Sequence, residues 1–383
     1  MDFELDESQR ELREVARAWV DKEVVPYAAA WDRAESVDLA IVGKLGAMGF
    51  LGIEIPEEYG GSGGTALDYC LLLEELGRGD SSVRGIVSVS LGLVGKSIKT
   101  YGTEAQRREW LPRLCSGEAL GCFALTEPGT GSDAGSLIST AVRDGDDWLL
   151  SGTKMFITNG TWADVAIFFA RTGGPGPRGV TAFLVPTDAP GFTRTEIKGK
   201  LGLRGQATAE LVLEQVRVPD SARLGDEGQG FKIAMGALDK GRMGVAAGCV
   251  GVARGCLEAS VKYAREREQF GKPIASYQLV QELLAYIAVE VEAARLLAWR
   301  VADLVERGKP FGTEASVAKL FASEAAVKAA NNAIQVFGGY GYIDEYPVAK
   351  YLRDARVLTL YEGTSQIQKL LIGRALTGVN AIV

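Results

Sequence analysis

The spacing of hydrophobic residues changes twice along this chain of 383 residues, and this change constrains the fold more than any other feature. Up to residue 118, apolar residues recur at helical spacing, as at Leu12, Val15, Ala16 and Trp19. From 119 to 228, short apolar runs alternate with turn residues, which is typical of an all-β domain. Helical spacing then returns. We therefore expect a multidomain α+β protein: an N-terminal helical domain (1–118), a middle β-barrel or sandwich domain (119–228) and a C-terminal four-helix bundle (229–383).

The same spacing places the individual elements. We expect N-terminal helices at 6–25, 37–48, 66–77, 83–100 and 104–115. The expected strands are 148–152, 165–170, 180–185 and 209–216, with an exposed hairpin tip at 173–177. The expected C-terminal helices are 231–264, 277–306, 313–337, 347–357 and 363–375.

The chain contains no histidine. This excludes a Ser-His-Asp hydrolase, a Cys-His protease, a His-ligated zinc site and a histidine general base. Acid–base chemistry must then fall to Glu, Asp, Lys, Tyr or Cys, or the chemistry must belong to a cofactor. The net charge of −7 also argues against a broad nucleic-acid or anionic-membrane surface.

The five cysteines include no pair at CxxC spacing, so we interpret them as buried thiols of a reducing compartment rather than as a metal site. The first six residues are acidic and have no apolar core, which is unlike a signal peptide. No apolar run is long enough to span a bilayer. We expect a cytoplasmic protein without a bound metal.

A glutamate stands between an aromatic residue and a glycine in the segment Tyr361-Glu362-Gly363-Thr364-Ser365-Gln366, at an expected turn between helices. An ordinary glutamate with a pKa of about 4.3 is too weak to remove a proton from carbon. Burial would raise that pKa and suit Glu362 to act as a base. Taken alone, a glutamate in a turn is more often a solvated surface residue.

Two further segments contain groups suited to a flat, phosphate-bearing ligand. Thr126 and Ser132 lie in a loop dense in Gly, hydroxyl and acidic residues, whose N–H groups suit a phosphate or a ring edge. Phe156 and Thr158 alternate on an expected strand and would share one face. The alternative for the loop is a tight turn that binds no ligand. The alternative for the second segment is an ordinary strand.

Positions in the C-terminal region also have two interpretations. Arg267 offers a planar fork suited to pyrophosphate, or it is a surface arginine at a helix C-terminus. Asp239 and Arg242 are three residues apart and could form a simple ion pair. Gly338 and Gly339 are not a Rossmann loop, because no strand precedes them and the GxGxxG spacing is absent.

Taken together, Cys122–Ser136, Arg267–Ile274 and Gln335–Ile372 resemble the acyl-CoA dehydrogenase family, and the resemblance covers essentially the whole chain. It implies FAD as cofactor and an acyl-CoA oxidised to the trans-2-enoyl thioester, with Glu362 as base and FAD as hydride acceptor. Phe156 stands where the family commonly has Trp. The implied FAD-binding residues are Thr126, Ser132, Phe156, Thr158, Arg267, Phe270, Gln335, Gly338, Gly339, Thr364 and Gln366. The implied substrate-binding residues are Ser132, Asp239, Arg242, Tyr361 and Gly363.

The resemblance also implies partners. One branch of the family has its catalytic glutamate at the position of Gly241, so glycine there favours Glu362. In the family, the residues matching Arg267, Phe270 and the 335–339 turn reach FAD held mainly by a neighbouring subunit, which implies a dimer at least and normally a tetramer. Electron-transfer flavoprotein is the usual electron acceptor.

Three alternatives stay open at this point. The acyl or prolyl group could be tethered to a carrier protein of secondary metabolism rather than to CoA. A nucleic-acid-associated flavoprotein would need a basic surface, against which the acidic chain argues. A purely structural relative without cofactor is disfavoured because both the glutamate and the FAD loops are present.

Overall fold

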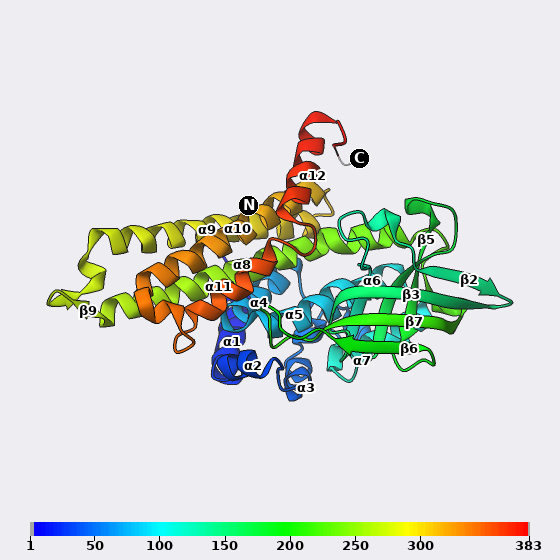
Figure 1. Cartoon of the computed structure of the whole chain (residues 1–383), viewed down its shortest axis with the longest axis horizontal. Coiled ribbons are helices and arrows are strands. Elements are labelled where there is room, and N and C mark those ends of the chain that lie inside the picture. The colour runs from blue at the N-terminus through cyan, green and yellow to red at the C-terminus, as the bar shows by residue number, and fades with distance from the viewer. Residues whose placement is uncertain (1–3, 382–383) are drawn as a thin grey trace.

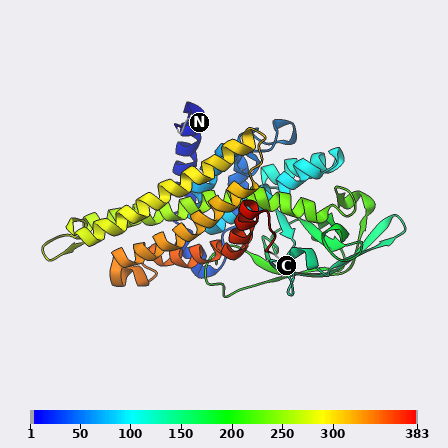
Figure 2. The ribbon, with the colours of Figure 1, turned by 90° about the horizontal axis from the view of Figure 1, so that it is seen from above.

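The computed structural model describes residues 4–381. A β-sheet occupies one end of an elongated molecule, and long helices extend from it to the other end, where a small hairpin forms the tip (Figure 1). The turned view shows the same order, with the hairpin and the sheet at opposite ends (Figure 2). The fold is the expected one, with an N-terminal helical region, a middle β-sheet and a C-terminal helical region.

The N-terminal region contains α1 (Glu7–Glu23), α2 (Ala28–Ala34), α3 (Ala40–Ala47), α4 (Ala66–Gly79), α5 (Ser81–Val87), α6 (Lys96–Tyr101) and α7 (Glu104–Ser116). Capping boxes led by Asp6, Thr65 and Thr103 begin α1, α4 and α7. These side chains accept hydrogen bonds from the otherwise unpaired first-turn N–H groups. The short helix α2 was not expected, because its seven residues are too few to show a clear period.

The expected helix at 83–100 is not a uniform α-helix. A π-helical stretch (Ser88–Gly95) separates α5 from α6, and all of its residues are buried. π-Helical turns are rare and occur often at functional sites. The sequence does not reveal this change from α-helix to π-helix, because a fully buried helix is apolar on all sides and shows no periodic pattern of polar residues.

The middle region is one sheet in the order β6-β7-β3-β2-β4-β5-β8, with β1 added parallel to β4. Its strands are β1 (Gly121–Ala124), β2 (Thr140–Asp144), β3 (Asp147–Thr158), β4 (Val165–Arg171), β5 (Val180–Pro186), β6 (Phe192–Glu196), β7 (Thr208–Pro219) and β8 (Arg223–Leu224). The four predicted strands lie within β3, β4, β5 and β7. The strands β1, β2, β6 and β8 were missed because they have at most five residues each.

The C-terminal region consists of α8 (Gly230–Glu266), α9 (Gln278–Glu306), α10 (Gly312–Phe337), α11 (Val348–Leu358) and α12 (Ser365–Thr377). The hairpin β9 (Glu268–Gln269) and β10 (Lys272–Pro273) joins α8 to α9. All five helices were predicted to within a few residues. The helix α8 is long and apolar enough to cross a membrane, but 72% of its most apolar window is buried inside the protein, as in a core helix.

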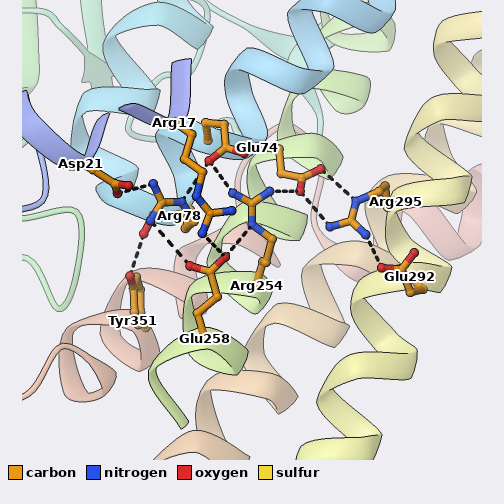
Figure 3. A network of polar contacts seen from close by, with 10 residues as sticks. Arg17, Asp21, Glu74, Arg78, Arg254, Glu258, Glu292, Arg295 and Tyr351 are labelled. Atoms are coloured by element: carbon orange, nitrogen blue, oxygen red, sulfur yellow. Dashed lines mark hydrogen bonds and ion pairs between the residues drawn. The ribbon is translucent and has the colours of Figure 1, made fainter. Parts of the chain in front are cut away.

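Buried ion pairs connect helices α1, α4, α8 and α9 (Figure 3). Arg254 on α8 binds Glu74 and Glu75 on α4, and Arg295 on α9 binds Glu74 as well. Arg78 binds Glu75 and reaches Asp21 on α1. Every buried charge in this network therefore has an opposite partner, which offsets the cost of removing it from water.

Candidate active site

Glu362 lies in the turn between α11 and α12, in the left-handed backbone region with φ of 51°. The turn is held through its carbonyl groups. Lys319 Nζ donates to the Gly363 carbonyl at 2.8 Å, and Gln368 Nε2 donates to the carbonyls of Glu362 and Gly363 at 3.1 Å each. Gly363 has φ of 91°, which favours glycine. The backbone N–H of Glu362 donates no hydrogen bond within the described residues.

The side chain of Glu362 points at α8. A Cβ added to Gly241 would lie 2.1 Å from Glu362 Oε2 and 3.0 Å from Leu93 Cδ2. Glycine at 241 therefore leaves the space that the carboxylate occupies. Glu362 Oε2 is buried and has no hydrogen-bond partner among the described residues. An unpaired carboxylate oxygen of this kind is available to a ligand.

Burial raises the pKa of Glu362 to about 7, and the nearby cations Arg84, Lys319 and Arg242 oppose that rise. Desolvation disfavours the charged form, whereas the cations favour it. The carboxylate is thus a stronger base than an ordinary glutamate and is still ionised in part at neutral pH. A glutamate that removes a proton from carbon needs such an environment.

Tyr361 precedes this glutamate in the chain, and Arg242 lies close enough to act on it electrostatically. The hydroxyl of Tyr361 accepts a hydrogen bond from Arg84 Nη2 at 2.5 Å. Arg242 is buried and forms an ion pair with half-buried Asp239. The predicted ion pair is therefore present, and Arg242 also acts electrostatically on Glu362.

A second group of predicted residues lies on the sheet. The backbone N–H of Met155 donates to the carbonyl of Thr126 at 2.9 Å, so Thr126 adjoins the strand of Phe156 and Thr158. Phe156 is 66% exposed, with φ of 60° at an irregularity in the pairing of β3 with β7. Such a bulge re-aims a side chain. Ser132 is exposed in the loop after Thr126.

The buried pair Glu127–Lys154 anchors that loop. Lys154 Nζ donates to Glu127 Oε1 at 2.8 Å, and the N–H groups of Ile138 and Ser139 donate to the same carboxylate. Lys154 has no exposed surface and Glu127 is 4% exposed. The pair therefore joins both ends of the 127–139 loop to β3 next to Thr126.

Five further predicted residues line a groove of about 600 Å³. Its walls include Arg267, Phe270, Gln335, Gly338 and Gly339. Phe270 is 94% exposed, and Arg267 lies 5.6 Å from the ring centre of Tyr340. The groove adjoins the β9–β10 hairpin at the tip of the molecule, whereas α12, which follows Glu362, lies near its middle (Figures 1 and 2). Within one chain, the residues of the groove and Glu362 therefore lie apart.

Thr364 and Gln366 lie at the start of α12. The Thr364 hydroxyl accepts from Ile367 N at 3.2 Å and caps the helix, and Gln366 is exposed. No group of three or more His, Cys, Asp or Glu side chains within residues 4–381 could hold a metal ion. All five cysteines are free and buried.

Sequence reasoning missed Arg84, Lys319, Gln368 and the Glu127–Lys154 pair. A lone arginine at the start of the apolar run 83–95 was the signal for Arg84. Lys319 had a similar signal, because it lies on the buried face of an alanine-rich helix. Charged groups at such positions need a partner or a function.

The residues on the sheet fit a flavin. Phe156 presents an exposed aromatic side chain, and the backbone of Thr126 is bonded to the same strand, so an aromatic surface and a hydroxyl-bearing residue adjoin, as a flat ring with polar edges requires. The unpaired oxygen of Glu362 leaves an acceptor for a proton. These groups are compatible with the FAD that the resemblance implies.

Comparisons with known proteins show the family of the chain. Family models match at residues 6–118 (Acyl-CoA dehydrogenase, N-terminal domain), 122–216 (middle domain) and 228–377 (C-terminal domain). The mitochondrial short-chain specific acyl-CoA dehydrogenase of Rattus norvegicus is 44% identical over 370 residues, 96% of this chain and 90% of the relative.

Two solved structures are similar throughout. Butyryl-CoA dehydrogenase from Megasphaera elsdenii superposes with a TM-score of 0.96 and 41% identity, covering 98% of this chain and 100% of its own. A glutaryl-CoA dehydrogenase from Mycobacterium smegmatis in complex with FADH2 has a TM-score of 0.95 and 40% identity, covering 99% and 97%. The chain therefore belongs to the acyl-CoA dehydrogenase family, whose members are oxidoreductases acting on CH–CH bonds.

Proposed function

We propose that this protein is an FAD-dependent dehydrogenase that converts an acyl-CoA to its trans-2-enoyl thioester, with Glu362 as the base. The observation that carries the proposal is the carboxylate of Glu362, which is buried against Gly241, unpaired at Oε2 and raised in pKa to about 7. It would take the proton from the carbon next to the thioester carbonyl.

Acidifying that carbon requires a donor to the thioester oxygen. The free backbone N–H of Glu362 would supply one, because Lys319 and Gln368 fix the neighbouring carbonyls and so the orientation of the turn. A donor aimed at the negative charge that develops on this oxygen stabilises the transition state by a few kcal/mol, about 2.7–4 kcal/mol in a measured case from another enzyme. Gly363 would leave room for the substrate, and Tyr361 would line its acyl end.

FAD would lie against Phe156 and Thr158, with Thr126 at the ring edge and Ser132 near both pyrophosphate and substrate. When bound, it supplies an acceptor for the hydride that leaves the adjacent carbon. Asp239 and Arg242 would contact the pantetheine arm. Thr364 and Gln366 would contact the adenosine part.

The groove at the tip would serve FAD of a second copy of the chain. Arg267, Phe270, Gln335, Gly338 and Gly339 form it, and it adjoins the hairpin far from α12 (Figure 1). The active assembly would thus be a dimer at least, and a tetramer by resemblance to the family. Electron-transfer flavoprotein would reoxidise the flavin. Five free cysteines accord with a reducing cytoplasm.

Anaerobic bleaching of the flavin near 450 nm tests this function. Short acyl-CoA esters should bleach the wild-type protein, and Glu362→Gln should retain FAD and ligand but lose nearly all bleaching. Wild-type rates in that variant would remove Glu362 as the base. Bleaching only by acyl or prolyl groups on a carrier protein would replace CoA by the carrier, and a protein that cannot be loaded with FAD would reject the function.

A further inference from the structure

Lys350 on α11 lies between two buried carboxylates. Its Nζ is 2.6 Å from Oδ2 of Asp354 on the same helix, and 2.9 Å from Oδ2 of Asp80 at the junction of α4 and α5. Asp80 and Asp354 are each 1% exposed. Burial opposes the charged form of Lys350, but the two carboxylates raise its pKa above the usual value, so the ammonium stays charged. We call these three residues the Lys350 triad.

Each carboxylate of the Lys350 triad also holds backbone from another segment. Asp80 Oδ1 accepts from two N–H groups in the first turn of α5 and so caps that helix. Asp354 Oδ1 accepts from the N–H of Leu203 at 2.7 Å, in the loop 197–207 between β6 and β7. Three segments that are far apart in the sequence therefore meet at one ammonium group: α5, the 197–207 loop and α11.

The 197–207 loop lies directly against both helices. A Cβ on Gly202 would lie 2.2 Å from a carbonyl oxygen of α11, so a side chain at 202 would collide with the helix. A Cβ on Gly85 of α5 would lie 2.2 Å from Nε2 of Gln206. Between these contacts, Leu203 has φ of 48°, a region that strains a residue with a side chain. Such strain persists only where the surrounding contacts fix the chain. Figure 2 shows this loop running from the sheet to the helices.

Each of the three segments leads to a different part of the candidate active site. The helix α11 ends shortly before Glu362. The 197–207 loop continues into β7, where Thr208 pairs with Thr158 of β3, the strand proposed to face FAD. The helix α5 carries Arg84, which donates to the hydroxyl of Tyr361. The Lys350 triad therefore joins the element that leads to the base to the element that pairs with the flavin strand.

Stability alone does not account for the Lys350 triad. Removing charged groups from water is costly, and replacing a buried ion pair with apolar groups is often neutral or even stabilising. One carboxylate is enough to pair the ammonium of Lys350, and Asp80 supplies it. The second carboxylate, Asp354, is the group that fixes the 197–207 loop to α11. Its contacts therefore point to a role in the relative placement of the segments.

We propose that Asp354 is a positioning residue, which through Lys350 and Leu203 sets the distance between the flavin strand and the Glu362 turn. The inference rests on the proposed function and adds to it a group that acts through its neighbours and not on the reacting atoms. The base, the substrate carbon and the flavin must be aligned, so a shift of about 1 Å between the loop and α11 would slow the reaction about a hundredfold.

Asp354→Asn tests the proposal in the FAD-loaded protein. The variant replaces the carboxylate that Lys350 binds, but Asp80 still pairs that lysine, so no buried charge is left alone. With a short acyl-CoA, the limiting rate of anaerobic bleaching per bound FAD should fall about a hundredfold, whereas the ester concentration at half the limiting rate should change less than about threefold. FAD content and the midpoint of urea unfolding should change little. A limiting rate like that of the wild type overturns the proposal.

Asp32→Asn is the matched control. Asp32 is also buried and also binds a cation of α11, Arg353, but it lies on α2 and does not contact the 197–207 loop through that carboxylate. The control should unfold at a lower urea concentration and keep the limiting rate of bleaching. An equal loss of rate in both variants would show that α11 needs only to be anchored, and would reject a positioning role specific to Asp354.

Gly202→Ala disturbs the same contact without changing a charge. The added methyl group would push the 197–207 loop away from α11, so the limiting rate should again fall with little change in the half-saturating ester concentration. If Asp354→Asn does not fold, an unchanged rate in Gly202→Ala overturns the proposal. If the wild type is bleached and both variants keep its rate, this inference alone fails. If no ester bleaches the wild type, the proposed function fails and this inference with it.

Discussion

Glu362 and Gly241 are complementary: a Cβ on Gly241 would lie 2.1 Å from Glu362 Oε2, although 121 positions separate the two residues. A contact this short cannot exist between real atoms, so any side chain at 241 must displace the carboxylate or the helix. Glycine in the middle of α8 costs about 0.5–1 kcal/mol relative to alanine. The space for the base explains why it stands there.

Gly241→Ala should therefore reduce flavin reduction by about a hundredfold, because a misplacement of about 1 Å can cost this much. FAD content should be unchanged. The matched control is Gly43→Ala in α3, where an added Cβ would meet nothing within 4 Å. The control should keep full activity and gain slightly in stability. Equal activity of the two variants would show that the position of the carboxylate is not critical.

The activity should rise with pH through about 7, since the pKa of Glu362 is raised to about 7 by burial and only the ionised carboxylate accepts a proton. The effect on stability has the opposite direction. A carboxyl with a raised folded-state pKa binds more protons when folded, so its contribution to stability falls as pH rises from about 4.5 to about 7. Urea unfolding of Glu362→Gln should lack this part of the pH dependence. If the activity instead rose with pH around 4.5, the value of an ordinary glutamate, the assignment of Glu362 as the base would be contradicted.

Lys319 should position the catalytic turn. Lys319→Met removes one of the two donors to the Gly363 carbonyl and one of the three cations that lower the pKa of Glu362. We expect a loss of about 1–3 kcal/mol in unfolding free energy and an upward shift in the pH profile of flavin reduction. Lys328→Met is a suitable control, because that lysine pairs with Glu290 on the surface. Loss of stability without a shift in the profile would restrict Lys319 to a structural role.

The Glu127–Lys154 pair should be essential as a pair. Glu127→Gln leaves a buried ammonium without its counter-ion, which should cost about 3–5 kcal/mol and weaken FAD retention. The double variant Glu127→Gln, Lys154→Met should recover much of the stability, as judged by urea unfolding, because the unpaired charge is gone. If stability recovered but FAD binding did not, the pair would be needed to hold the 127–139 loop in its FAD-binding conformation. Additive losses would contradict the ion-pair interpretation.

The sequence by itself determined the architecture and singled out Glu362 as the candidate base. Long elements such as α8, α9 and α10 repeat their apolar spacing over many turns, so the period is unambiguous. The segment around Glu362 is contiguous in the sequence, and its motif could be read directly. Short elements such as α2 and β6, by contrast, depend on packing against neighbours and have too few residues to show a period.

Only the tertiary structure decided what surrounds that base. Gly241, Arg84 and Lys319 lie 121, 278 and 43 positions from Glu362, and helix packing alone brings them to it. The π-helical stretch was also hidden, because a wholly apolar segment does not reveal its hydrogen-bond register. Electrostatic effects depend on distance and burial, which a linear sequence does not contain. The sequence therefore identified the glutamate, whereas the fold set its pKa and placed Arg84, Lys319 and Arg242 near it.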